Sequence, residues 1–438
     1  MLKIGASIVD ITPPVGVALD GYGGRTDFSL GVHDPLSARC LYLDDGATRV
    51  ALVICDLIGI GSFLARRARE LIAERPGLKP ECVLIAATHT HAGPAGVRGR
   101  GEPVLVETIA RQICGAVRVA CSGAVSGQLK YGTTSLDSIA QNRRHPDWPI
   151  DHRLDVLAAD TPEGRNIATL ARYSCHPTTM EGSNLLYSAD YPGETRRTIE
   201  QVIGNGTAAL YFNGACANIN PAWIRQDFDD VHRIGSIVGA KAAALSQELR
   251  PLGIDHRAHN IRWSELTAKP VTAGRLVEGS LAAVSRTVSV PYRTGPPDEE
   301  VVARLEDLTP QLNSAATTGE RREAAAKRTA AQMERVALAR TRGKDSHRDE
   351  EVQAMRLGDG LFLVALPGEV FVETQEEIRA RSGIEDLIVV SCANDYPGYF
   401  CRAEAFAQGG YEAGVTPFAP EADGLLMRAA VAALEEVR

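Results

Sequence analysis

Two histidines separated by one threonine, His89 and His91, are the strongest local candidates for chemistry in this chain. They follow an apolar run that starts at Cys82, and residues two apart on an extended strand end point to the same side. Both imidazoles can then face one point, and imidazole is a common ligand of zinc. The motif alone fits a pair of hydrogen-bonded structural histidines equally well, so both interpretations stay open at this stage.

Two further side chains at the ends of apolar runs can complete a metal site. His176 is followed by Pro177, which favours an extended backbone at the histidine. Glu369 ends another apolar run, where an acid next to a buried strand needs a partner or a metal. Either residue alone also fits a structural role. Two histidines, one carboxylate and an open position, however, form a common ligand set for catalytic zinc.

The remaining histidines and the cysteines offer no second metal motif. Seven other histidines look less suitable as ligands, namely His33, His145, His152, His232, His256, His259 and His347. The last three lie in polar stretches, and we expect them to be solvated. Nine cysteines are scattered without a CxxC pair, which disfavours thiolate zinc clusters and redox motifs.

A strand–helix–strand pattern positions the histidine pair. Residues 50–60 form a compact apolar run, residues 63–75 have helical spacing, and residues 82–94 give a second strand. This order indicates a βαβ crossover in a partly parallel sheet. Ligands collect at the carboxyl ends of such strands, where the histidines lie.

The rest of the chain continues this alternation, with one change of composition. We expect further strands at 166–177, 208–221, 360–369 and 386–395, and helices at 106–122, 193–206 and 234–249. Residues 296–350 are charged and alanine-rich, which predicts two amphipathic helices on the surface, with a dimerisation arm as the alternative. The predicted fold is α/β, with mixed sheets flanked by helices, in a single domain over 1–438 that carries this helical insertion.

Composition narrows the class of protein. The chain of 438 residues is 44% apolar, enough for a large core, and its net charge of −8 argues against nucleic-acid binding. No run of 18 apolar residues and no signal-like start is visible, which predicts a protein of the cytoplasm without a transmembrane segment. The sequence leaves open whether the protein forms a homo-oligomer.

At this point the residues resemble a known family, the neutral/alkaline ceramidases, which are zinc amidases that split the N-acyl bond of ceramide. Matching segments run in family order through most of the chain. They are GASIVDITPP (5–14), GYGGR (21–25), ICDLIGI (54–60), THTHAGP (88–94), NRR (142–144), CHPTTM (175–180), SADYPGE (188–194), NGACANINP (213–221), LPGE (366–369) and NDYPGY…GGYEA (394–413). THTHAGP and the tyrosine-rich tail are the most specific of these.

The resemblance implies roles for individual residues. The metal ligands would be His89, His176, Glu369 and Tyr399. Tyr399 is preferred over Tyr396 because the family has a second functional tyrosine twelve residues after its ligand tyrosine, and Tyr411 meets that spacing. His91 would lie beside the metal, and Arg143 falls where the family has an arginine lining the site.

Two departures from the family matter for the chemistry. The serine of the family's GDxSPN turn is replaced by Asn220, which can donate a hydrogen bond to an oxyanion but cannot form an acyl intermediate. A metal-activated water must then attack the carbonyl. The sequence also predicts no signal peptide and no C-terminal immunoglobulin-like domain, which puts ceramide itself in doubt as the substrate.

The sequence therefore predicts a zinc-dependent hydrolase that cleaves an N-acyl amide bond in a small or lipid-like compound. Asp56 and Asp190 are candidates for orienting the ligating imidazoles, with turn formation or helix capping as the alternative. Two other functions stay open. One is hydrolysis of esters, lactones or carbamates at the same site, and the other is a catalytically silent ligand-binding protein.

Overall fold

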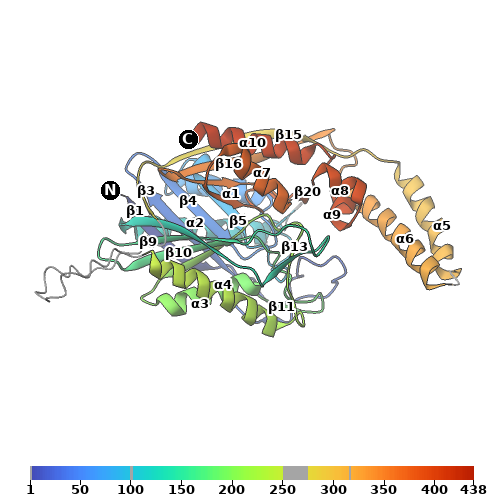
Figure 1. Ribbon diagram of the computed structural model, residues 1–438, viewed down its shortest axis with the longest axis horizontal. Coiled ribbons are helices and arrows are strands. Elements are labelled where there is room, and N and C mark those ends of the chain that lie inside the picture. The colour runs from blue at the N-terminus through green and yellow to red at the C-terminus, as the bar shows by residue number, and fades with distance from the viewer. Residues whose placement is uncertain (1, 99–101, 250–274, 315–316) are drawn as a thin grey trace, which may run out of the picture.

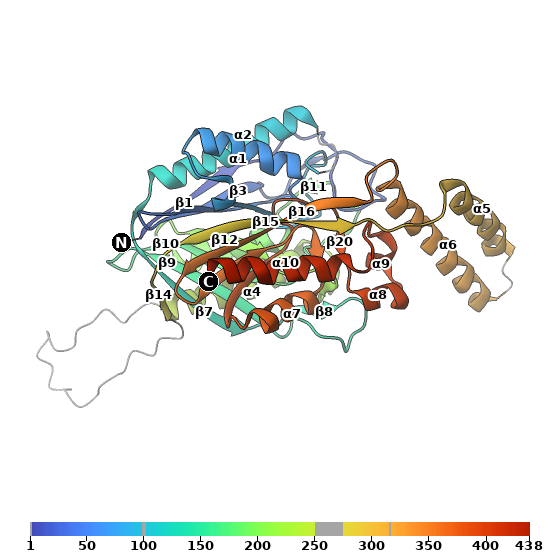
Figure 2. The ribbon, with the colours of Figure 1, turned by 90° about the horizontal axis from the view of Figure 1, so that it is seen from above.

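The computed structural model describes residues 2–98, 102–249, 275–314 and 317–438. In this part of the chain, three larger sheets surround one shared core, and helices cover their outer faces (Figures 1 and 2). This arrangement of mixed sheets and flanking helices confirms the predicted fold class.

The first sheet contains the predicted βαβ unit. Its order is β5-β4-β3-β1-β6, and β4 and β5 pair in parallel with helix α1 between them in the chain. Helix α2 lies beside α1 on the same face of the sheet (Figure 2). The elements are β1 (Lys3–Asp10), β3 (Ser37–Asp44), β4 (Arg49–Cys55), β5 (Val83–Ala87), β6 (Val125–Ser126), α1 (Ser62–Glu74) and α2 (Pro103–Ser122), with a short 3-10 helix at Pro80–Cys82.

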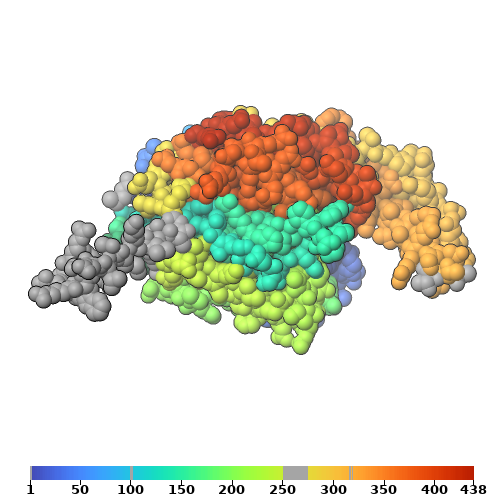
Figure 3. Space-filling model, in the orientation of Figure 1, coloured from blue at the N-terminus to red at the C-terminus, as the bar shows by residue number. Residues whose placement is uncertain are grey.

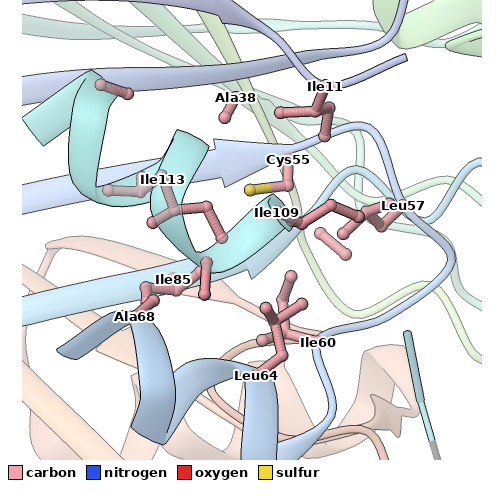
Figure 4. Close-up of a cluster of buried hydrophobic side chains, with 14 of the residues drawn as sticks. Ile11, Ala38, Cys55, Leu57, Ile60, Leu64, Ala68, Ile85, Ile109 and Ile113 are labelled. Carbon is pink, nitrogen blue, oxygen red and sulfur yellow. The ribbon is translucent and has the colours of Figure 1, made fainter. Parts of the chain in front are cut away.

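Strand β4 is buried on both faces, which explains its unbroken apolar sequence. Val50 and Leu52 point into the core shared by the three sheets, whereas Val53 points toward the helices. Figure 4 shows Leu64 of α1 and Ile109 of α2 packed on that outer side. Burying such a side chain contributes about 1.5–3 kcal/mol, so the strand is a rigid support for the residues that follow β4 and β5.

The other two large sheets follow the same rule. The second has the order β12-β10-β9-β7-β14 and is covered by α3 and α4, and the third has the order β15-β16-β17-β19 and is covered by α7 and α10. The elements of these two layers are β7 (Gln128–Ser135), β9 (Arg153–Asp160), β10 (Asn166–Tyr173), β12 (Ala208–Asn213), β14 (Arg275–Val277), β15 (Ala282–Pro291), β16 (His347–Gly358), β17 (Leu361–Ala365), β19 (Asp386–Val390), α3 (Asp190–Ile203), α4 (Phe228–Glu248), α7 (Val372–Ser382) and α10 (Ala422–Val437).

Short elements close the structure around the carboxyl ends of these strands. They are β2 (Gly31–Val32), β8 (Ala140–Asn142), β11 (Leu186–Tyr187), β13 (Ile219–Pro221), β18 (Glu369–Val370), β20 (Tyr399–Phe400), α8 (Ala403–Gln408) and α9 (Tyr411–Val415). Strand β18 pairs in parallel with β20. No helix among the described residues is long and apolar enough to cross a membrane.

Two helices occupy the segment predicted as a helical insertion. Helix α5 (Asp298–Ser314) and helix α6 (Thr318–Ala339) form a hairpin that projects from the body of the molecule (Figures 1 and 3). Thr317 and Glu320 form a capping box that starts α6. The segment then returns to the third sheet, since β16 begins at His347.

Candidate metal centre and active site

Residues from three segments that follow strands meet at one buried point. His89 follows β5, His176 follows β10, and Glu369 follows β17, which ends at Ala365, and begins β18. The Nε2 atoms of His89 and His176 are 3.0 Å apart, and His89 Nε2 lies 3.5 Å from Glu369 Oε2. All three side chains are at most 1% exposed. The structure therefore brings together the two imidazoles and the carboxylate proposed from the sequence.

The backbone at His89 differs from the extended strand end that the sequence suggested. Strand β5 already ends at Ala87, and His89 has a φ of 72°, in the left-handed region. Its N–H donates to the carbonyl of Leu57 at 3.0 Å. His89 and His91 face the same point because of this turn, and not because side chains alternate along a strand. A non-glycine residue held at positive φ costs of order 1–3 kcal/mol, and such strain clusters at functional sites.

Backbone carbonyls orient the two imidazoles. His89 Nδ1 lies 2.6 Å from the carbonyl oxygen of Ile58, and His176 Nδ1 lies 3.3 Å from that of Cys216. A carbonyl can only accept, so both Nδ1 atoms carry the proton and both Nε2 atoms present lone pairs to the cluster.

The expectation that Asp56 and Asp190 orient these imidazoles is wrong. Asp56 accepts hydrogen bonds from the backbone and hydroxyl of Ser37 at 2.8 and 2.9 Å, and from Arg196 at 2.8 Å. Asp190 caps a local turn by accepting from the N–H of Thr179 at 3.1 Å. Both carboxylates support the loops around the site without touching a ligand imidazole.

The cluster fits a metal cation. Two Nε2 lone pairs that face each other at 3.0 Å repel unless a positive charge lies between them. Glu369 Oε2 is also buried without a hydrogen-bond partner, although a buried carboxylate oxygen is costly when left unpaired. Potential ligand atoms of His89, His176, Cys216 and Glu369 all lie within 4.8 Å of one another.

Cys216 was missed in the sequence, where the absence of a CxxC pair disfavoured cysteine ligands. It lies in the loop between β12 and β13, a fourth strand end at the same edge, and it is fully buried. The only signal was its place in the segment NGACANINP, which also carries Asn220.

Two tyrosines from the tail lie next to the carboxylate. The Tyr396 hydroxyl donates a short hydrogen bond to Glu369 Oε1, while Tyr399 is the residue directly paired with Glu369 between β18 and β20. The Tyr399 hydroxyl accepts a hydrogen bond from Arg143 at 3.4 Å. Burial, followed by the charge of Glu369, raises the pKa of Tyr399 well above its ordinary value. Tyr399 as a ligand stays a prediction.

The electrostatics of the cluster accommodate one positive charge. Burial disfavours charged imidazole, but Glu369 raises the pKa of His89 to about 9. Burial and the neighbouring His89 together lower the pKa of His176 well below its ordinary value. Burial favours a neutral Glu369, yet the interaction with His89 lowers the pKa of this carboxyl overall. These three shifts together favour one positive charge at the cluster.

His91 lies beside the cluster and is held by the segment 21–25. Its Nε2 is 3.0 Å from His176 Nε2, and its Nδ1 is buried without a partner. Arg25 donates to the carbonyl of His91 at 2.9 Å, and the Tyr22 ring meets the imidazole edge-on at 5.1 Å. The GYGGR motif therefore fixes the position of this imidazole.

The predicted site residues line one cavity of about 680 Å3, which we call the site cavity. His89 lies behind its wall. The residues proposed from the sequence that line it are His91, Arg143, His176, Asn220, Glu369, Tyr399 and Tyr411. The structure thus gathers residues from seven separate segments around one space large enough for a small molecule.

Arg143 organises the polar side of the site cavity. Its Nε pairs with Glu412 at 2.6 Å, and its guanidinium lies 5.7 and 5.9 Å from the rings of Tyr399 and Tyr411. Asn220 also lines the site cavity, and its side-chain oxygen is buried without a hydrogen-bond partner. The Arg143 guanidinium and the NH2 group of Asn220 are donors that can orient a carbonyl and stabilise charge that develops on its oxygen.

Helix α6 forms another wall of the site cavity, which the sequence did not predict. Thr329, Gln332, Met333, Val336 and Arg340 line it from one face of the helix. The projecting hairpin therefore contributes side chains to the wall of the site cavity.

Fold and site together define a mixed α/β protein with a buried His/Glu centre at the carboxyl ends of its strands. The sequence model of the neutral/alkaline non-lysosomal ceramidase family, N-terminal part, matches residues 2–221. The chain belongs to this family, and membership supports a hydrolase that acts on an amide bond.

Individual relatives agree with this assignment. The chain is similar to neutral ceramidase from Pseudomonas aeruginosa, with 24% identity over 95% of this chain and 69% of that protein. Neutral ceramidase B of Dictyostelium discoideum is 28% identical over 47% of this chain, but only 33% of that protein is covered. The crystal structure of the Pseudomonas enzyme has the same fold, with a TM-score of 0.75 at 22% identity over 98% of this chain and 73% of that one.

Proposed function

We propose that this protein is a zinc-dependent hydrolase that cleaves an N-acyl amide bond with water as the nucleophile. The convergence of His89, His176 and Glu369 below the site cavity carries this proposal. Imidazole and carboxylate, completed by the Cys216 thiolate or the Tyr399 phenolate, form a donor set that suits zinc. Family membership supports the amide bond.

The cluster and the neighbouring His91 would have different roles in the reaction. A divalent cation held there supplies a Lewis acid that activates water and polarises a carbonyl group. Burial and the charges of His89 and Arg143 lower the pKa of His91, so its imidazole is neutral and keeps a free lone pair. His91 takes the proton of the attacking water and returns it to the leaving nitrogen.

Hydrogen-bond donors on the opposite side stabilise the carbonyl oxygen. Tyr411, Arg143 and the amide of Asn220 all line the site cavity. Each donor that is lost costs about 3 kcal/mol in reactions of this type. Asparagine cannot form an acyl intermediate, which is why the proposal assigns the attack to water.

The substrate is an N-acyl compound of small or lipid-like character. The relatives named above are neutral ceramidases, which supports a lipid-like acyl group. Ceramide itself is not required by the residues lining the site cavity.

Two alternative functions would use the same site. An ester, lactone or carbamate needs less protonation of its leaving group than an amide, and the same centre can hydrolyse it. A catalytically silent binding protein is suggested by Asn220 at the family's serine position. Rates of the wild-type protein on a matched amide and ester distinguish an amidase from an esterase. Absence of turnover on both substrates, with metal bound, would indicate a binding protein without catalytic activity.

The metal ligands are tested with His89→Ala. We expect this variant to lose bound zinc, measured by mass spectrometry of the purified protein, and to lose turnover by at least about 10³-fold, since a metal site without one ligand also misplaces the water. His152→Ala removes an exposed histidine that pairs with Asp137, and it should retain both. Zinc content and rate unchanged in His89→Ala would refute the assignment.

A further inference from the structure

A second cavity of about 420 Å3 adjoins the site cavity. Arg98, Arg340 and Tyr396 line both, so the two cavities meet along these three side chains. Tyr396 also contacts the cluster, because its hydroxyl donates to Glu369. A molecule held at the metal centre can therefore extend from one cavity into the other.

Cationic side chains dominate this second cavity, which we call the cationic cavity. Two carboxylates, Asp20 and Asp395, face four cations there. The cations are Arg98, Arg340, Lys344 and Arg348. Asp20 binds Arg98 through two hydrogen bonds of 2.6 Å, and Asp395 pairs with Arg348. The charge of the lining is thus positive after the carboxylates are counted.

Arg340 differs from Arg98 and Arg348 in this respect. Among the residues that the structure describes, its guanidinium forms no ion pair and no hydrogen bond. Arg342, two residues further on, pairs with Asp298 at 2.6 Å. A cation at the end of α6 is favourable for the helix dipole alone. That effect does not explain why a half-buried guanidinium lies where two cavities meet.

Arg98 and Arg340 both line the junction of the two cavities. Arg98 uses Nε and Nη2 for Asp20, which leaves its Nη1 group for a ligand. Arg98 Nη1 and the Arg340 guanidinium can therefore each donate a charge-assisted hydrogen bond to one anion at this junction.

We propose that the substrate carries an anionic group, which Arg340 and Arg98 bind at the junction of the two cavities while the amide lies at the metal centre. This inference rests on the proposed function and narrows its substrate class to N-acyl compounds with a negative charge. Arg340 is then a specificity-determining residue supplied by the helical hairpin.

Three substrates with the same acyl chain test the inference. N-lauroylglycine carries a carboxylate, N-lauroyltaurine a sulfonate, and N-lauroylethanolamine no charge. A hydrogen bond to a charged group is worth about 1.5–3 kcal/mol, or roughly 10- to 100-fold. We expect kcat/KM for the two anions to exceed that of the neutral amide by roughly 10-fold or more in low salt, and to fall as salt screens the charges.

The variant Arg340→Gln should remove most of this preference. We expect it to lower kcat/KM roughly 10-fold or more for the anionic amides, mainly through KM, and to leave N-lauroylethanolamine within about 2-fold. Arg321→Gln removes an exposed arginine from the other end of the same helix, and it lines neither cavity. This control should match wild type on all three substrates.

Binding without turnover separates this inference from the proposed function. Calorimetry with metal-stripped protein and N-lauroylglycine should show binding that Arg340→Gln weakens roughly 10-fold. Hydrolysis of none of the three amides would refute the proposed function, and the calorimetry would still decide the anion site. Equal rates on all three amides, or binding unchanged in Arg340→Gln, would overturn the anion site.

Discussion

His91 differs from the other histidines of the cluster in what its nitrogens do. His89 and His176 each direct Nδ1 to a carbonyl, whereas the Nδ1 of His91 is buried without a partner. It is not in the group of residues whose potential ligand atoms lie within 4.8 Å of one another. His91 is therefore the residue best placed to move a proton beside the metal.

We expect His91→Asn to keep the metal and lose the chemistry. General acid–base catalysis contributes roughly 10²–10⁴-fold, so kcat on an amide should fall by this factor with zinc content unchanged. Parallel measurements of metal content and of kcat on N-lauroylethanolamine check this. Loss of zinc in the variant would instead make His91 a ligand.

At the scale of single residues, the sequence indicated which histidines and which acid form the cluster, but it did not indicate all of the other residues in contact with them. Apolar runs precede the pair His89 and His91, and also His176 and Glu369. That position indicated that these side chains share one edge of a sheet. Cys216 could not be recognised, because a single cysteine without a CxxC partner has the same pattern whether it packs in the core or binds a metal. Tyr399 came only from the family resemblance.

At the scale of elements, the loops that follow the strands hold the site. The segment 21–25 packs against the loop that carries His89 and His91, and Gly21 in this segment has a φ of 111°. A Cβ added to Gly21 would lie 2.7 Å from the Cα, Cβ and Cγ of His91. Only glycine allows this approach, which couples the GYGGR motif to the catalytic imidazole.

Gly21→Ala should therefore displace His91 as well as strain the loop. We expect the free energy of unfolding to fall by about 1–3 kcal/mol and kcat to fall at least roughly 10-fold. Gly23→Ala is the matched control, because nothing lies within 4 Å of a Cβ at that position and its φ is not in the left-handed region. Denaturant unfolding and steady-state kinetics check both variants, and equal behaviour of the two would contradict the coupling.

Element boundaries explain what the sequence could not provide. The apolar runs located β4, β5, β10 and β12, but the runs extend beyond the strands into the loops that carry the ligands. The positive φ of His89 has no signal in a single sequence. The charged, alanine-rich pattern of α6 predicted a helix, yet it did not reveal that one face lines the site cavity.

At the scale of the whole molecule, three sheets meet around one core and direct several strand ends to the same place. The third sheet carries an unusual buried acid, Glu350 of β16, which pairs with Arg348 at 2.6 Å. Burial, followed by the charge of Asp395, raises the pKa of Glu350 to about 8. The folded protein therefore holds this proton more tightly than the unfolded chain.

This difference predicts how stability depends on pH. The contribution is complete below the ordinary carboxyl pKa near 4.5 and is lost as the pH rises toward 8. We expect Glu350→Gln, compared with wild type, to gain on the order of 3 kcal/mol of unfolding free energy between pH 5 and pH 8. Glu351→Gln, next to it and paired with Arg69, leaves Glu350 in place and should keep the wild-type pH dependence. Urea titrations at both pH values check the two variants; parallel curves for Glu350→Gln and wild type would contradict the assignment.

The convergence itself was only partly predictable. A single crossover could be recognised from the run 50–94, and strand ends with polar residues suggested a common edge. Which sheets pack against each other depends on contacts between residues far apart in the chain, such as Leu52, Leu210 and Leu363 in the shared core. No local pattern specifies these contacts.

The most direct measurement is anomalous X-ray diffraction at the zinc absorption edge from crystals of the purified wild-type protein. We expect one peak about 2.0–2.2 Å from the Nε2 atoms of His89 and His176 and from Oε2 of Glu369, with the fourth neighbour identifying Cys216 or Tyr399. The absence of a peak from this cluster in zinc-supplemented crystals, or a peak only at exposed histidines, would contradict a zinc centre in this protein.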